Sequence, residues 1–112
     1  MRSVQVRLHN FYQMFSVLPC DVRHYVRQNK YPYMVWTERE EDSYHSLDAN
    51  NRKAEQIING TVDYFTKREF DSTVDTIQDI LDAAESVAWY LEAVQYEDET
   101  NLIHYTWIWR LS

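Results

Sequence analysis

The segment that decides the fold is Leu102–Leu111, which reads LIHYTWIWRL. Every second residue of it is apolar or aromatic, namely Ile103, Tyr105, Trp107, Trp109 and Leu111. Successive side chains of a β-strand point to opposite faces, so this alternation predicts a strand with one buried face. Aromatic side chains bury the largest areas, so this face must be covered by another part of the chain.

Two segments have the spacing of amphipathic helices that could cover this face. In residues 4–18, apolar side chains recur at intervals of three and four, and Pro19 ends the pattern because proline cannot continue a helix. Residues 73–85 show the same kind of spacing. Ser72 and Asp75 form a weak capping box that predicts where this second helix begins.

Four further segments have strand character: residues 20–26, 31–36, 52–66 and 89–96. With Leu102–Leu111 they predict the order α-β-β-β-α-β-β. The expected fold is therefore α+β, a two-layer sandwich in which a mainly antiparallel sheet of about five strands packs against two helices. A chain of 112 residues is expected to form one domain, residues 1–112.

The dipeptide Asn59-Gly60 lies inside one of these strands and permits two interpretations. Asn-Gly between apolar residues is a strong signal for a tight hairpin turn. Alternatively, the strand is continuous, and Gly60 marks a bulge or a close approach of another group to the backbone.

Composition restricts the class of function. The net charge of −7 argues against affinity for nucleic acid, because that affinity comes mainly from neutralising phosphates. The beginning of the chain does not resemble a signal peptide, and no apolar run approaches the ~18 residues that span a bilayer, so we expect no membrane partner. The single cysteine, Cys20, is typical of a protein from a reducing compartment.

Residues 38–50 have no periodicity and are rich in carboxylates, which predicts a long loop. A loop that only solvated the surface would not need Tyr44 and Leu47. We therefore regard the segment, with Trp36, as a candidate assembly interface, and the alternative is a solvated connector. The candidate residues are Trp36, Glu38, Glu40, Glu41, Asp42, Tyr44, Leu47 and Asp48.

The sequence contains no pattern typical of catalysis or of cofactor binding. Its histidines, His9, His24, His45 and His104, are scattered, and no pair has the spacing of metal ligands on a helix. Glycine-rich phosphate loops and nucleophile elbows are absent. We therefore expect a protein that is not an enzyme and that uses neither a cofactor nor a metal.

Three stretches together resemble one family. Residues 31–36, YPYMVW, are similar to a strand opening of the form PPYIVY, and residues 59–67, NGTVDYFTK, are similar to a central strand that ends in hydrophobic-Tyr-Thr-Lys. Residues 96–107, YEDETNLIHYTW, resemble a closing hairpin of the ETGLIH type, with Asn101 in place of glycine. In this order, and with a helix before the hairpin, they resemble the small tail-completion, or tail-terminator, proteins of long-tailed bacteriophages and prophages.

This resemblance implies a sheet packed on helices, a continuous strand through Gly60, and no catalytic residue. It further implies a homo-oligomeric ring, usually a hexamer, at the head-proximal end of the tail tube in the virion. Such a ring ends tube growth and contacts the tail tube protein and the head connector or head-completion protein. DNA passes through it without specific binding.

Two other functions remain open at this point. The chain is also compatible with another component of the phage neck, such as a head-completion or minor capsid protein. A small acidic inhibitor that mimics DNA would need carboxylates spaced along one surface, whereas here they cluster in two predicted loops and the second helix.

Overall fold

The computed structural model describes residues 3–42 and 56–112. The described part contains two α-helices and five strands, and a short 3₁₀ turn, Met14–Val17, extends the first helix. In chain order the elements are α1 (Val4–Gln13), β1 (Asp21–His24), β2 (Tyr33–Glu41), β3 (Ile58–Thr66), α3 (Ser72–Ala83), β4 (Val87–Glu97) and β5 (Leu102–Leu111).

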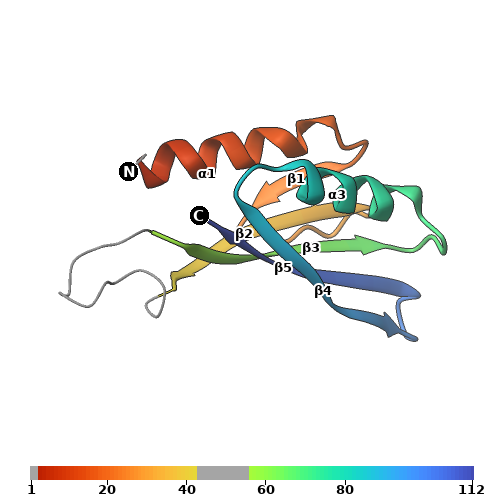
Figure 1. Cartoon of the computed structure of the whole chain (residues 1–112). Coiled ribbons are helices and arrows are strands. Elements are labelled where there is room, and N and C mark those ends of the chain that lie inside the picture. Colours follow the sequence, from red (N-terminus) through yellow and green to blue (C-terminus); the bar gives the residue numbers. More distant parts are fainter. Residues whose placement is uncertain (1–2, 43–55) are drawn as a thin grey trace.

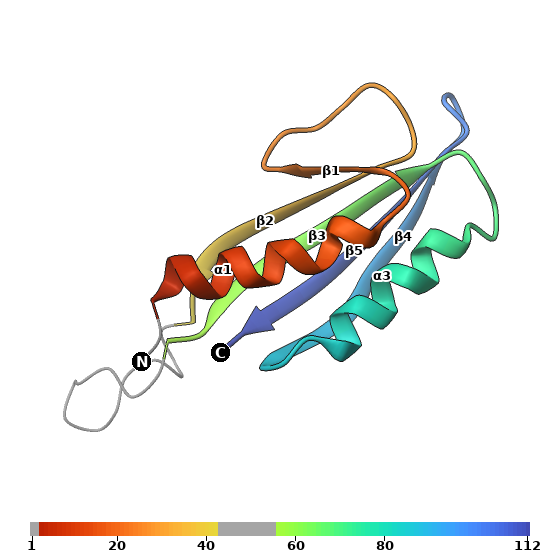
Figure 2. The same cartoon turned by 90° about the horizontal axis from the view of Figure 1, so that it is seen from above.

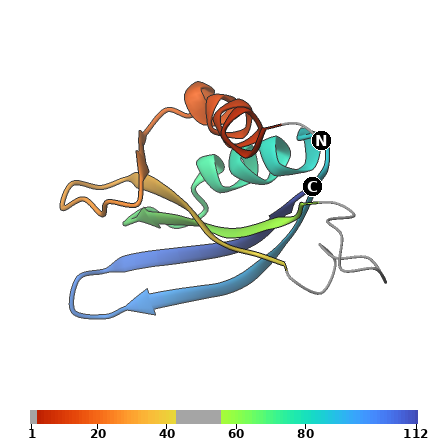
Figure 3. The same ribbon diagram turned by 90° about the vertical axis from the view of Figure 1, so that its left-hand side faces the viewer.

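The strands form one sheet in the order β1-β2-β3-β5-β4. The short β1 pairs with β2 in parallel, and the other three pairings are antiparallel. Both helices lie on the same side of the sheet (Figures 1 and 3). The predicted α+β class and the predicted order of elements are therefore confirmed.

The main core lies between the helices and the face of β5 that carries its aromatic side chains. Trp107, Trp109 and Leu111 are buried there, whereas Ile103 and Tyr105, nearer the β4–β5 turn, are only partly buried. The Phe11 ring of α1 packs edge-to-face on Trp109, with 4.8 Å between the ring centroids. The alternating strand is thus covered by a helix, as its pattern requires.

The opposite face of the sheet has a smaller buried cluster at one end: Tyr33, Val35, Phe65 and Leu102. Arg27, from the connection between β1 and β2, places its guanidinium carbon 5.2 Å from the centroid of the Phe65 ring. The sheet is therefore partly covered on both faces, although its helices lie on only one.

Strand β2 continues beyond the predicted end at Trp36, to Glu41. The prediction of a loop that begins at residue 38 is wrong for this part. Glu38 pairs with Gly60 of β3, and the pairing resumes beyond a bulge with Glu40 and Glu41. The ladder to β3 holds these glutamates in a strand although their own β-propensity is low.

Strand β3 runs without interruption through Asn59-Gly60, so the hairpin interpretation is wrong. A Cβ atom at Gly60 would overlap the indole of Trp109 and the carbonyl oxygen of Thr37. Glycine is therefore required by a close approach, and the bulge lies opposite it, on β2.

Asp71 joins β3 to α3. One carboxylate oxygen accepts a hydrogen bond from the backbone N–H of Thr73 at 2.9 Å, and the other accepts from the hydroxyls of Tyr64 at 2.7 Å and Thr66 at 2.8 Å. Asp71 is thus the N-cap of α3, which corrects the predicted capping box at Ser72. Burial alone would raise the pKa of Asp71, but the hydrogen bonds from Tyr64, Thr73 and Thr66 outweigh it and lower the pKa.

Replacing Gly60 with alanine should destabilise the fold by about 3 kcal/mol, because the new methyl group must displace the Trp109 ring or the β2 backbone. Urea melts followed by tryptophan fluorescence measure this loss. Thr61→Ala, at the next position of the same strand, is the matched control and should lose well under half as much. Equal losses for the two variants would show that the close approach is unimportant.

Asp71→Asn should lower the free energy of unfolding at pH 7 by about 2 kcal/mol, since the hydrogen bonds to a charged acceptor are weakened. The pKa of Asp71 is lower in the folded than in the unfolded state, so its stabilisation is present above the unfolded-state pKa and is lost as pH falls through the folded-state pKa. The difference between the two proteins should therefore shrink in acid. A difference in free energy of unfolding that stays constant from pH 7 to about pH 2 would contradict this. Asp75→Asn, on the exposed side of the same helix, is the control and should change the free energy of unfolding much less.

Candidate assembly surface

Trp36 is buried in the main core, which corrects its assignment to the assembly interface. Its indole stacks on the His24 ring, with 3.7 Å between the ring centroids and 2° between the planes, and it also stacks on Tyr12 of α1. An indole held in this way joins β1 and α1 to the sheet and is not available to a neighbouring subunit.

Much of the acidic run that follows is engaged within the subunit. Glu38 accepts a hydrogen bond from the Tyr25 hydroxyl and contacts Nε2 of His24 at 2.5 Å. Asp42 accepts a hydrogen bond from the guanidinium of Arg110. Glu41 is half-buried and is not without a partner. Glu40 is exposed. Tyr44, Leu47 and Asp48 lie outside the described residues.

Within the described strands, the large hydrophobic residues that are exposed all lie on β4. This strand lies at one end of the sheet order, and within the described part of the chain no strand pairs with its outer edge. Leu91, Val94 and Tyr96 lie on the side that the helices cover elsewhere, yet they are 41%, 53% and 57% exposed. Tyr90, on the opposite face, is 56% exposed.

The helix layer explains why this surface is open. Helix α3 packs near the beginning of β4, where the indole N–H of Trp89 donates to Asp82 at 3.4 Å. Figure 2 shows β4 running alongside α3, and Figure 1 shows that the strand then leaves the helix layer and continues into the β4–β5 hairpin. We call the exposed half of the strand, Tyr90 to Tyr96, the β4 surface.

Sequence reasoning missed this surface because the pattern of residues 89–96 is that of an ordinary half-buried strand. The missing information was the strand order. Only the insertion of β5 between β3 and β4 makes β4 an edge strand. A long exposed edge with apolar side chains is a template for association with another chain.

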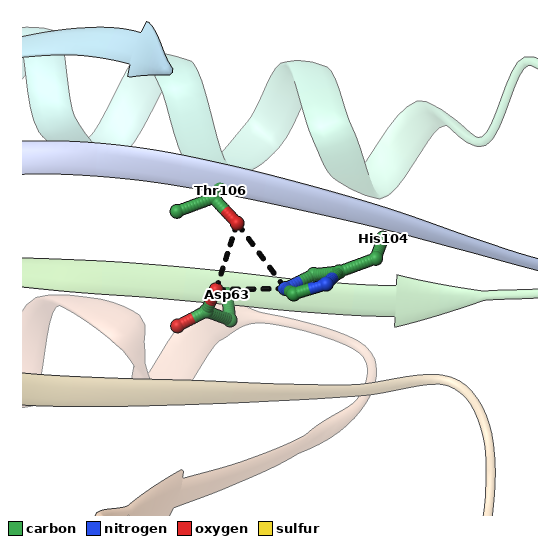
Figure 4. A network of polar contacts seen from close by, with 3 residues as sticks. All are labelled: Asp63, His104 and Thr106. Atoms are coloured by element: carbon green, nitrogen blue, oxygen red, sulfur yellow. Dashed lines mark hydrogen bonds and ion pairs between the residues drawn. The ribbon is translucent and has the colours of Figure 1, made fainter. Parts of the chain in front are cut away.

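A polar network lies on the face of the sheet that bears no helices (Figure 4). Oδ1 of Asp63 on β3 accepts hydrogen bonds from Nε2 of His104 at 2.7 Å and from the hydroxyl of Thr106 at 2.8 Å, both on β5. The His104 ring also stacks on Phe65, 4.1 Å between centroids. Asp63 and Thr106 are direct partners in the ladder, a proximity that becomes visible once the register is known.

This network resembles a catalytic triad in composition but not in geometry. In a triad the carboxylate binds one ring nitrogen of the histidine and the hydroxyl binds the other. Here Thr106 and Asp63 both contact the same nitrogen, Nε2, and the Thr106 hydroxyl is itself bonded to the carboxylate. The arrangement cross-links two strands and does not activate a nucleophile.

Within residues 3–42 and 56–112, no three histidine, cysteine or acidic side chains are grouped so that they could hold a metal ion. Neither helix of that part is long and apolar enough to cross a membrane.

No protein-family model matches the chain, and no curated protein has a significantly similar sequence.

Cys20 should be an unreactive thiol. It is partly buried against the main core, and burial, together with the charges of Asp21 and Asp71, raises its pKa to about 11. At pH 8 only about one molecule in a thousand then carries the reactive thiolate, against about one in four for an ordinary cysteine. Iodoacetamide should alkylate the folded protein at least ~100-fold more slowly than the urea-unfolded protein. Equal rates, measured by mass spectrometry, would contradict this assignment.

Proposed function

We propose that this protein is a structural subunit of a phage tail, which assembles into a homo-oligomeric ring, a hexamer by its resemblance, at the head-proximal end of the tail tube. There it ends polymerisation of the tube and joins the tail to the head connector or head-completion protein. Its place is the virion, after assembly in the host cytoplasm.

The observation that carries this proposal is the β4 surface. In the described sheet β4 is an edge strand, and it carries exposed apolar side chains. Such an edge is expected of a subunit that buries it against another copy of itself or against a neighbouring ring. The Asp63–His104–Thr106 network does not offer a competing catalytic site, because Thr106 and Asp63 contact the same ring nitrogen.

The positions of the three family-like stretches support the proposal. Residues 31–36 lead into β2, residues 59–67 contain most of β3, and residues 96–107 form the turn and much of β5. They therefore lie together in one continuous part of the sheet, β2-β3-β5-β4. The replacement of glycine by Asn101 is also compatible, because its φ of 54° lies in the left-handed region that asparagine tolerates.

The charge of the subunit suits passage of DNA. With a net charge of −7, the surface does not attract phosphates in general, so DNA can slide past the ring without being held. A DNA mimic would instead present its carboxylates as a regular array. Among the described acidic residues, Glu38 and Asp42 are bonded to side chains of the same subunit.

A genetic experiment tests the proposal in the phage or prophage that encodes the protein. Deleting the gene should give full heads and tails that are unjoined or abnormally long, seen by negative-stain electron microscopy. Wild-type protein supplied in trans should restore joining, and Leu91→Lys/Val94→Lys should not, because it places two charges on the β4 surface.

Val17→Lys/Val26→Lys is the matched control, since both valines are exposed away from β4. It should restore joining as well as the wild type does. Normal, joined tails in the absence of the gene would contradict the proposed function. Heads that fail to retain DNA beside normal tails would instead identify a head-completion protein.

A further inference from the structure

A groove lies at the end of the molecule that carries the C-terminus. It is bounded by α1, by the turn between α3 and β4, and by the end of β5, and its volume is about 520 Å³. Its polar lining includes Arg7, Asn10 and Ser86, and its apolar lining includes Phe11, Val87 and Leu111. The groove therefore combines donors for a polar ligand with apolar walls.

Arg7 is an unusual member of this lining because it is a buried cation, only 9% exposed. Its Nη1 donates to the backbone oxygen of Gln56 at 2.7 Å and its Nη2 to the side-chain oxygen of the same residue at 2.6 Å. Both acceptors are neutral, and Nε is buried with no partner. Glu85 also lines the groove, but it is exposed and forms no ion pair with Arg7.

A buried guanidinium without a carboxylate is energetically unfavourable, because desolvation of the charge is not compensated by an opposite charge. A carboxylate that docks in the groove would supply that charge and an acceptor for Nε, and bonds between arginine and carboxylate are among the strongest in proteins. The chemistry of the groove therefore selects an acidic ligand.

The same subunit carries exposed carboxylates in the turn between β4 and β5. The turn between β4 and β5 reads Glu97-Asp98-Glu99-Thr100-Asn101, and all of it is exposed. A bond from the Thr100 hydroxyl to Glu97 and one from the Tyr96 hydroxyl to Asn101 shape the turn. Among the described residues, Asp98 and Glu99 form no ion pair, so their charges remain available.

The turn and the groove cannot meet within one subunit. Figures 1 and 2 show the β4–β5 turn at one end of the sheet and the C-terminus, beside which the groove lies, toward the other. The turn is also continuous with the β4 surface, so one contact can include both.

We propose that Asp98 and Glu99 of one copy dock in the Arg7 groove of the next copy. The inference rests on the proposed ring, for which it specifies the contact between subunits. Because the two halves of the contact are different surfaces of the same chain, the association is head-to-tail, and head-to-tail association produces a closed ring when the rotation between copies permits it.

Substitution of the exposed turn tests this without disturbing the core. Asp98→Asn/Glu99→Gln should weaken self-association at least ~10-fold, measured by analytical ultracentrifugation, whereas the control Glu69→Gln/Asp79→Asn, with the same change of charge on exposed residues, should not. High salt should weaken association of the wild type more than that of the turn variant. Association of the turn variant equal to that of the wild type would overturn the proposed contact.

The Arg7 side of the contact needs a second measurement, because Arg7→Gln removes a buried side chain and can unfold the protein. Asn10→Cys mixed with Glu99→Cys should form a disulfide between subunits under mild oxidation, whereas Asn10→Cys mixed with Asp79→Cys should not. Equal cross-linking of the two mixtures would overturn the proposal.

A cyclic peptide of residues 96–102 separates failure of the contact from failure of the function. Added to ¹⁵N-labelled wild-type subunit, it should shift the Arg7 Nε–H resonance, and the peptide with Asn and Gln at the acidic positions should not. No shift, with rings that still assemble on tails, would overturn the contact and leave the proposed function in place. A shift in a protein that tails do not need would support the groove and overturn the function.

Discussion

The fold depends on the contact between the Trp109 indole and the backbone of Gly60. The only glycine of the chain lies where the Trp109 indole contacts the neighbouring strand, so the ring can approach the β3 backbone closely. From that position the Trp109 ring forms an edge-to-face pair with Phe11, and this contact holds α1 against the sheet. Trp107, opposite Val62 on the same strand, continues this buried face and donates to Gln78 of α3 at 3.1 Å. Trp109 and Trp107 thus contact α1 and α3, respectively, from the same face of β5.

The features that the sequence predicted correctly depend on local patterns. The alternation in Leu102–Leu111 identifies a strand with one buried face whatever its neighbours are, and the spacing of apolar residues in 4–18 and 73–85 identifies the helices. The features it did not predict depend on partners distant in sequence. Glu38, Glu40 and Glu41 are in a strand because β3 pairs with them, and Asp71 caps α3 in place of Ser72 because Tyr64 and Thr66 also donate to it.

The candidate site was harder to predict for the same reason. Whether a strand such as residues 89–96 is central or exposed is decided by strand order, which no local pattern contains. The sequence predicts Trp36 in the candidate interface because it adjoins the acidic segment, yet the rings that stack on it, His24 and Tyr12, come from β1 and α1. The Asp63–His104–Thr106 network likewise requires the register of β3 with β5.

The distribution of charge favours a head-to-tail arrangement over a two-fold dimer. If two copies paired their β4 edges antiparallel about the middle of Val87–Glu97, the two Glu92 side chains would lie opposite each other, and like charges in that position are destabilising. The register shift between Leu91 and Ala93 also interrupts the strand at that point, which weakens a regular ladder across the edge. Contact between an acidic turn and a groove with a buried arginine avoids both problems. In such an assembly each copy uses its turn to bind one neighbour and its groove to bind the other. An open row of copies therefore always has a free turn at one end and a free groove at the other, and addition of copies stops when these two ends meet and close the ring.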